Sequence, residues 1–132
     1  MLLKLKRFSE GVWFDYPEGG KFKIRAITPK HFLEFREKSK KGKQIIKNTA
    51  DEDQIVDNYD DALMSWLIFD YALAEWSDLE VEGASNEEEI KEAVFNDRPL
   101  RDWIMERASQ VFKTEEKAVE GELKNSETSL GG

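Results

Sequence analysis

Three aspartates, Asp57, Asp60 and Asp61, are spaced so that a helix would bring their carboxylates onto one face. Carboxylate oxygens grouped in this way can hold a hard cation such as magnesium or calcium. The same spacing is typical of an acidic helix face that only keeps a protein soluble. We interpret the three aspartates as a solubilising face and expect no metal site.

The sequence offers few other groups for catalysis. His31 is the only histidine and lies beside Phe32, so we expect it to pack or to lie at the surface rather than to act in a triad or bind metal. The chain has no cysteine, which excludes disulfides, thiolate zinc sites and a thiol nucleophile. Asp70 is the one carboxylate in a strongly apolar stretch, where an acid/base role and a hydrogen bond to a neighbour are the alternatives. We expect no catalytic residues, no cofactor and no enzyme.

Length and composition bound the class of protein. The chain has 132 residues, of which 36% are charged, and we expect one domain over residues 1–119. The N-terminus mixes charged and apolar residues without a cleavage-site pattern, so no secretory signal is expected. No stretch approaches the roughly 20 apolar residues of a membrane span. We therefore expect a soluble intracellular protein that does not contact membranes.

The charge is divided along the chain. Residues 1–47 carry 13 Lys and Arg against 5 Asp and Glu, whereas residues 48–132 carry 7 against 23. Unlike charges on two parts of one chain favour self-association of copies, and the alternative is that both parts are solvated surfaces. The acidic part would repel phosphates, so we expect no nucleic-acid partner.

A β-hairpin is expected over residues 11–27. Val12 to Tyr16 is aromatic and strand-prone, Pro17 to Gly20 has turn composition, and Lys21 to Ile27 alternates charged with apolar residues. An isolated hairpin is marginal in water, so its apolar face must lie on a helix or on another chain. We take six hairpin residues as the candidate partner-binding set: Trp13, Phe14, Tyr16, Lys21, Lys23 and Arg25.

The remaining elements are expected to be helices over about 28–40, 53–76, 85–95 and 98–119. Thr28 before Pro29 is a typical helix start, and Ser85 or Asn86 before three glutamates is another. Residues 40–53 lack periodicity and are expected to form a loop, in which only 44–46 favours a short strand. Residues 120–132 have too little apolar surface to order and are expected to be a disordered tail.

The helix over 53–76 is the most informative element. Its last fifteen residues, ALMSWLIFDYALAEW from Ala62 to Trp76, are apolar on nearly every side, so the helix must be wrapped by the fold or shared with another chain. The expected fold class is α+β and mostly helical, with the hairpin and about four helices around this long central helix. The expected core residues are Tyr59, Leu63, Trp66, Leu67, Leu73, Trp76, Trp103 and Ile104.

Four segments, in this order, resemble one family. They are an aromatic strand and turn leading to KIRAITP (23–29), the end of the long helix at EWSDLEVEG (75–83), an acidic helix followed by RPLRDWI (98–104), and a polar tail containing Lys124 and Asn125. Together they resemble the tail assembly chaperones of long-tailed bacteriophages, as the short form of the frameshifted pair that precedes the tape measure protein. Ser77 to Leu79 and the long basic loop after Arg36 depart from the family pattern.

The resemblance implies a non-catalytic chaperone that coats the tape measure protein before the tail tube polymerises. It implies a longer form, made by frameshifting near Lys124, whose added domain recruits the tail tube protein. It also implies a location in the host cell cytoplasm and absence from the mature virion. The alternative functions are an acidic adaptor or DNA-mimicking inhibitor unrelated to tails, and a small metal-dependent enzyme using the Asp57 cluster.

Overall fold

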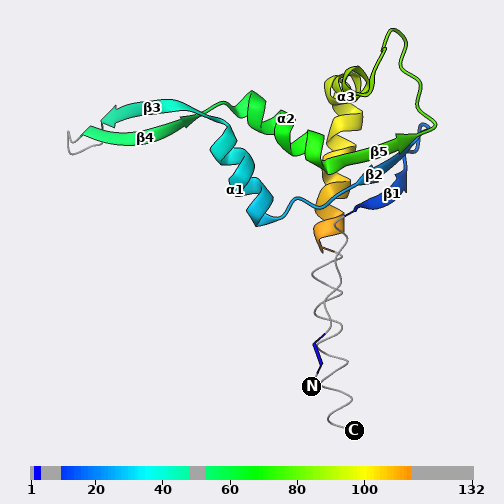
Figure 1. Ribbon diagram of the computed structural model, residues 1–132, viewed down its shortest axis with the longest axis horizontal. Coiled ribbons are helices and arrows are strands. Elements are labelled where there is room, and N and C mark those ends of the chain that lie inside the picture. Colours follow the sequence, from blue (N-terminus) through cyan, green and yellow to red (C-terminus); the bar gives the residue numbers. More distant parts are fainter. Residues whose placement is uncertain (1, 4–9, 48–52, 114–132) are drawn as a thin grey trace. The chain divides into compact units, whose positions relative to one another are not determined.

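The computed structural model describes residues 2–3, 10–47 and 53–113 and has an α+β fold (Figure 1). Within these residues there are four helices and two small sheets. The elements are β1 (Val12–Asp15), β2 (Lys21–Ile24), α1 (Pro29–Lys38), β3 (Lys40–Lys47), β4 (Asp53–Tyr59), α2 (Asp61–Ala72), β5 (Leu73–Ser77), α3 (Glu87–Asn96) and a further helix over 98–113.

The chain divides into two compact units. The first unit comprises residues 1–27 and 69–132, and the second comprises residues 28–68. The three-stranded sheet β1-β2-β5 belongs to the first unit, and the two-stranded ribbon β3-β4 belongs to the second. Each unit is therefore described separately.

The hairpin expected over 11–27 is confirmed in part, as the antiparallel pair β1-β2, whose second strand ends at Ile24. Val12 pairs with Ile24 at one end and Asp15 with Lys21 at the other. Gly19 and Gly20 have φ angles of 116° and 87°, which side-chain-bearing residues rarely adopt, so the turn depends on glycine. Strand β5 adds to the free edge of β2, where Phe22 pairs with Trp76.

The expected long helix over 53–76 is wrong. Its first part is strand β4, its middle is the 12-residue helix α2, and its end is strand β5. The β-branched residues Ile55 and Val56 of β4 pair with Ile45 and Gln44 of β3. Their β-propensity and the cross-strand packing outweigh the apolar spacing that predicted a helix. Residues 40–47, expected to be mainly a loop, supply the partner strand β3.

The boundaries of α2 have identifiable causes. The Asp60 Oδ1 accepts a hydrogen bond from the Leu63 backbone N–H at 3.1 Å, which caps the start of the helix. At the other end, Leu73 enters the sheet beside Ile24, so the chain passes directly from helix to strand. The three aspartates consequently do not share a helix face, because Asp57 lies on β4 and Asp60 precedes the helix.

Two other helix starts agree with the sequence. The Thr28 hydroxyl accepts a hydrogen bond from the His31 backbone N–H, with Pro29 at the first helical position of α1. At α3, the Asn86 Oδ1 accepts from the Glu89 N–H at 2.8 Å. The last helix is described up to residue 113, and the remainder of its expected span, like the expected tail at 120–132, lies outside the described residues.

The core of the first unit lies where the sheet meets the helices. Phe22, Ile24, Phe69, Leu73 and Ile104 are each at most 1% exposed. The Phe69 ring packs against Phe95 of α3 with centroids 5.2 Å apart. Among the described residues, no helix is long and apolar enough to span a membrane.

Candidate partner-binding surfaces

The hairpin aromatics divide between the two faces of the sheet. Phe14, Tyr16 and Phe22 surround the Trp103 ring, with centroid distances of 6.4, 4.9 and 6.1 Å. Desolvation by burial, aided by Glu18, raises the pKa of Tyr16. Trp13 faces the other way and remains 47% exposed. Of the three aromatics taken as contact candidates, only Trp13 therefore presents a largely open ring.

The three candidate cations of β2 and its continuation have different environments. Lys21 is exposed at the turn end of the strand. The Lys23 ammonium lies 3.6 Å from the Glu75 carboxylate on β5, and its side chain is only 21% exposed. The Arg25 guanidinium lies over the Tyr71 ring at 5.0 Å from the centroid. Lys23 and Arg25 thus contribute to the packing of the first unit, and Lys21 remains the most accessible of the three.

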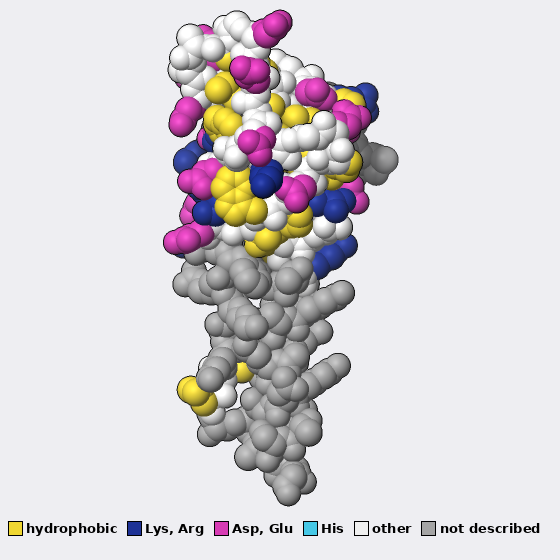
Figure 2. All heavy atoms as spheres, turned by 90° about the vertical axis from the view of Figure 1, so that its right-hand side faces the viewer, with side chains coloured by type: hydrophobic (Ala, Val, Ile, Leu, Met, Phe, Trp, Pro, Cys, Tyr) yellow, Lys and Arg dark blue, Asp and Glu magenta, His cyan; other side chains and the backbone are white. Residues whose placement is uncertain are grey.

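A pocket of about 410 Å³ opens beside Trp13 in the first unit. Its lining residues are Trp13, Ala74, Glu75, Trp76, Glu87 and Lys91. The Lys91 ammonium is held by the Asp70 carboxylate at 2.9 Å and the Asp70 carbonyl at 3.0 Å. The pocket therefore places the exposed Trp13 ring beside Glu75 and Glu87. Figure 2 shows the same mixture on one face of the molecule, where apolar side chains lie between acidic and basic ones.

The residues expected in the core have varied burial. Leu73 and Ile104 are fully buried, and Trp103 is half-buried within its aromatic cluster. Trp76 is half-buried and lines the pocket. In the second unit Tyr59, Trp66 and Leu67 are half-buried, whereas Leu63 is exposed at 39% rather than enclosed.

The second unit exposes an unusual amount of apolar surface. Ile45 and Ile55 on the ribbon are 66% and 67% exposed, and Leu33 on α1 is 61% exposed. Phe32 and Ile46 are exposed at 45% and 43%. This surface was not expected, because Ile55 was assigned to the helix over 53–76 and residues 40–53 mainly to a loop. The short strand favoured at 44–46 was the signal that pointed to β3.

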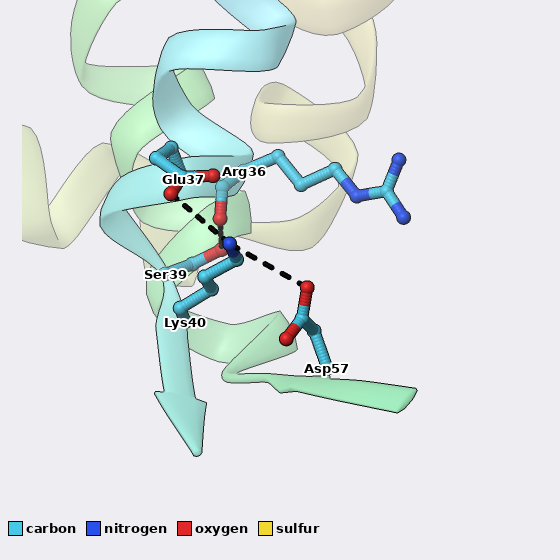
Figure 3. A network of polar contacts seen from close by, with 5 residues as sticks. All are labelled: Arg36, Glu37, Ser39, Lys40 and Asp57. Carbon is cyan, nitrogen blue, oxygen red and sulfur yellow. Dashed lines mark hydrogen bonds and ion pairs between the residues drawn. The ribbon is translucent and has the colours of Figure 1, made fainter. Parts of the chain in front are cut away.

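The base of the ribbon is tied to α1 by a polar network (Figure 3). The Lys40 ammonium lies 3.0 Å from the Glu37 carboxylate and 3.5 Å from that of Asp57. The hydrogen bond to Glu37, together with the nearby Asp57 charge, raises the pKa of Lys40. The buried Ser39 hydroxyl donates to the Arg36 carbonyl at 2.8 Å, and the Ser39 carbonyl accepts from the Asp60 N–H at 2.8 Å. These contacts hold the junction between α1 and β3 next to the junction between β4 and α2.

No group of three or more possible metal ligands lies close together in the part of the chain that the structure describes. The His31 ring is hydrogen-bonded to the Thr28 hydroxyl at 2.8 Å and stacks with Phe35 at 6.4 Å between centroids. Asp70 holds Lys91. His31 and Asp70 thus both have structural partners in the fold.

Comparisons with family models, with curated proteins and with solved structures found no match for this chain.

Proposed function

We propose that the protein is a tail assembly chaperone of a long-tailed bacteriophage, which binds the tape measure protein and coats it before the tail tube polymerises. In this proposal it is non-catalytic and acts in the host cell cytoplasm, without entering the virion. The resemblance of its segments to that family supplies the identity of the partner. The observation that carries the binding role is the exposed apolar surface of α1 in the second unit, formed by Phe32 and Leu33.

That surface suits an apolar helical partner. A monomer rarely leaves large contiguous apolar patches open, and those that persist commonly mark binding sites. On α1, Leu33 and Phe32 are 61% and 45% exposed, although 36% of the residues of the chain are charged and polar side chains were available for a solvated face. A tape measure protein is a long helix that exposes apolar side chains until the tube encloses it. Covering those side chains would stabilise both partners by removing apolar area from water.

The pocket beside Trp13 is proposed as a second contact in the first unit. The Trp13 indole can bind both apolar side chains and cations, and the Glu75 and Glu87 carboxylates would favour a positively charged neighbour. The pocket thus fits a helix turn that presents an apolar residue next to a lysine or arginine. The tail tube protein would be recruited by a frameshift-extended form, through a domain added after this chain.

Co-expression with the tape measure protein of the same phage tests the proposal. Expressed alone, the tape measure protein should be found mainly in the insoluble fraction, and expressed with this chain it should become soluble and co-purify. Leu33→Glu and Trp13→Ala should each reduce the recovered complex, because each removes an exposed apolar contact without opening a core.

Ser109→Glu is a matched control for Leu33→Glu, since it also places one carboxylate at an exposed, uncharged helix position. It should leave recovery unchanged. If the tape measure protein stays insoluble with the wild-type chain, the coating function is wrong. Capture of a nucleic-acid enzyme in place of the tape measure protein would favour the acidic inhibitor.

A further inference from the structure

One face of the β3-β4 ribbon has a self-complementary pattern. In the antiparallel register Ile45 lies opposite Ile55, and Lys43 lies opposite Asp57. Directly opposed residues of a strand pair project from the same face, so these four side chains share one face with Asp53 of β4. Ile45 and Ile55 are the two most exposed isoleucines in the described part of the chain. We call this surface the Ile45 face.

Charge is segregated by strand on the Ile45 face. Strand β3 contributes Lys43, and strand β4 contributes Asp53 and Asp57. Along the strands, the pair of Ile45 and Ile55 lies between Asp53 and the pair of Lys43 and Asp57. A β-bulge between Lys40 and Gly42 brings Lys40 onto this face, where its ammonium lies 3.5 Å from Asp57. The basic first part of the sequence therefore supplies strand β3, and the acidic second part supplies the adjacent strand β4.

We propose that the Ile45 face is an interface between two copies of this chain, related by a two-fold axis parallel to the strands. Rotation about that axis lays β3 of each copy over β4 of its partner. Ile45 of one copy then meets Ile55 of the other, and Lys43 meets Asp57, with each contact made twice as an isologous interface requires. The apolar pair becomes covered, and every charged contact named here joins unlike charges.

Other two-fold arrangements of the ribbon are disfavoured by the same residues. An axis in the interface but perpendicular to the strands would set Asp57 of one copy on Asp53 of the other. Pairing the free edges of two β4 strands around Ile55 would also oppose Asp53 and Asp57. The edge of β3 is interrupted by its bulge, a device that discourages edge pairing. Charge complementarity thus selects the face-to-face arrangement with the axis along the strands.

The contact should be weak. A two-stranded face is much smaller than the roughly 1,200 to 2,000 Å² of a stable interface, so micromolar or weaker dimerisation is expected. Its ionic part should weaken as the Debye length falls from about 10 Å at 0.1 M salt to about 3 Å at 1 M. A weak contact of this kind would be sufficient between neighbouring copies that coat a tape measure protein. The dimer itself does not require the tape measure protein. Either proposal can therefore fail without the other.

Sedimentation equilibrium of the full chain with charge-swapped variants tests the interface. The wild type should dimerise at low salt. Lys43→Glu and Asp57→Lys should each weaken dimerisation at least tenfold, because each opposes like charges twice. An equimolar mixture of the two variants should recover dimers, since Glu at position 43 of one copy then meets Lys at position 57 of the other.

Two controls separate the interface from folding and from net charge. Lys30→Glu makes the same charge change as Lys43→Glu at an exposed position away from the ribbon, and it should dimerise like the wild type. Ile45→Thr should weaken dimerisation, whereas Ile46→Thr, the same change on the opposite face of the same strand, should not. Circular dichroism melts establish that each variant is folded. A monomeric wild type at low salt, or a mixture that fails to recover dimers, would overturn the proposal.

Discussion

The rings of Tyr16 and Trp103 meet edge to face, with their centroids 4.9 Å apart and their planes at 66°. The contact joins the hairpin to the last described helix across about 87 positions of sequence. It places the hairpin aromatics at 14 and 16 inside the first unit and leaves Trp13 on the outside. The division between enclosed and exposed aromatic rings therefore follows from the alternation of side chains along a single strand.

Trp103→Ala should lower the free energy of unfolding by about 3 kcal/mol, because it removes the ring that Phe14, Tyr16 and Phe22 surround. Trp13→Ala is the matched control, since it deletes the same side chain from an exposed position, and it should cost less than about 1 kcal/mol. Urea unfolding followed by circular dichroism measures both. Equal losses would show that the aromatic cluster around Trp103 is not the core described.

Lys91→Met should destabilise the protein by about 1 to 2 kcal/mol. The Lys91 ammonium donates to both the carboxylate and the carbonyl of Asp70 near the C-terminal end of α2, where a positive charge is favourable, and its side chain is only 19% exposed. Lys21→Met removes the same charge from an exposed strand position and should have little effect. Equal melting temperatures for the two variants would show that the contact between Lys91 and Asp70 does not stabilise the fold.

Glu89→Gln should reduce the stability of the protein at neutral pH but not at low pH. The Glu89 carboxylate accepts hydrogen bonds from the backbone N–H of Ser85 at 2.7 Å and from its hydroxyl at 3.0 Å, and these lower the pKa of Glu89 in the folded state. A lowered folded-state pKa means that the stabilisation is fully present above the unfolded value of about 4.3 and is lost as the pH falls through the folded value.

Urea unfolding of both proteins from pH 7 down to pH 3 checks this sign. The difference in unfolding free energy between wild type and Glu89→Gln should shrink as the solution is acidified below about pH 4.3. Other carboxylates titrate equally in both proteins, so the difference isolates Glu89. A difference that stays constant across the range would mean that the Ser85 contacts do not favour the ionised carboxylate.

Local signals in the sequence were sufficient for several elements. The glycine turn and the alternation of 21–27 predicted the hairpin, and the capping residues Thr28 and Asn86 marked helix starts that the structure also has. Each of these features depends on residues only a few positions apart. These turns and helix starts can therefore be predicted without knowledge of the rest of the fold.

The elements around α2 could not be predicted in the same way. The segment from 53 to 76 is apolar enough for one helix, but each of its ends pairs with another strand. Trp76 pairs with Phe22 far away in the sequence, and such a non-local pairing overrides local spacing. Ile55 pairs with the nearby Ile45, but residues 40–53 were interpreted mainly as a loop, so the ribbon and its Ile45 face were not predicted.

The molar mass of the complex between this chain and the tape measure protein is the most direct test of the coating function. Light scattering coupled to size exclusion of the co-purified complex measures how many copies bind one tape measure chain. The proposal predicts many copies for each tape measure chain, increasing in number with the length of the tape measure segment supplied. A complex with one copy whatever the segment length, or no complex at all, would contradict it.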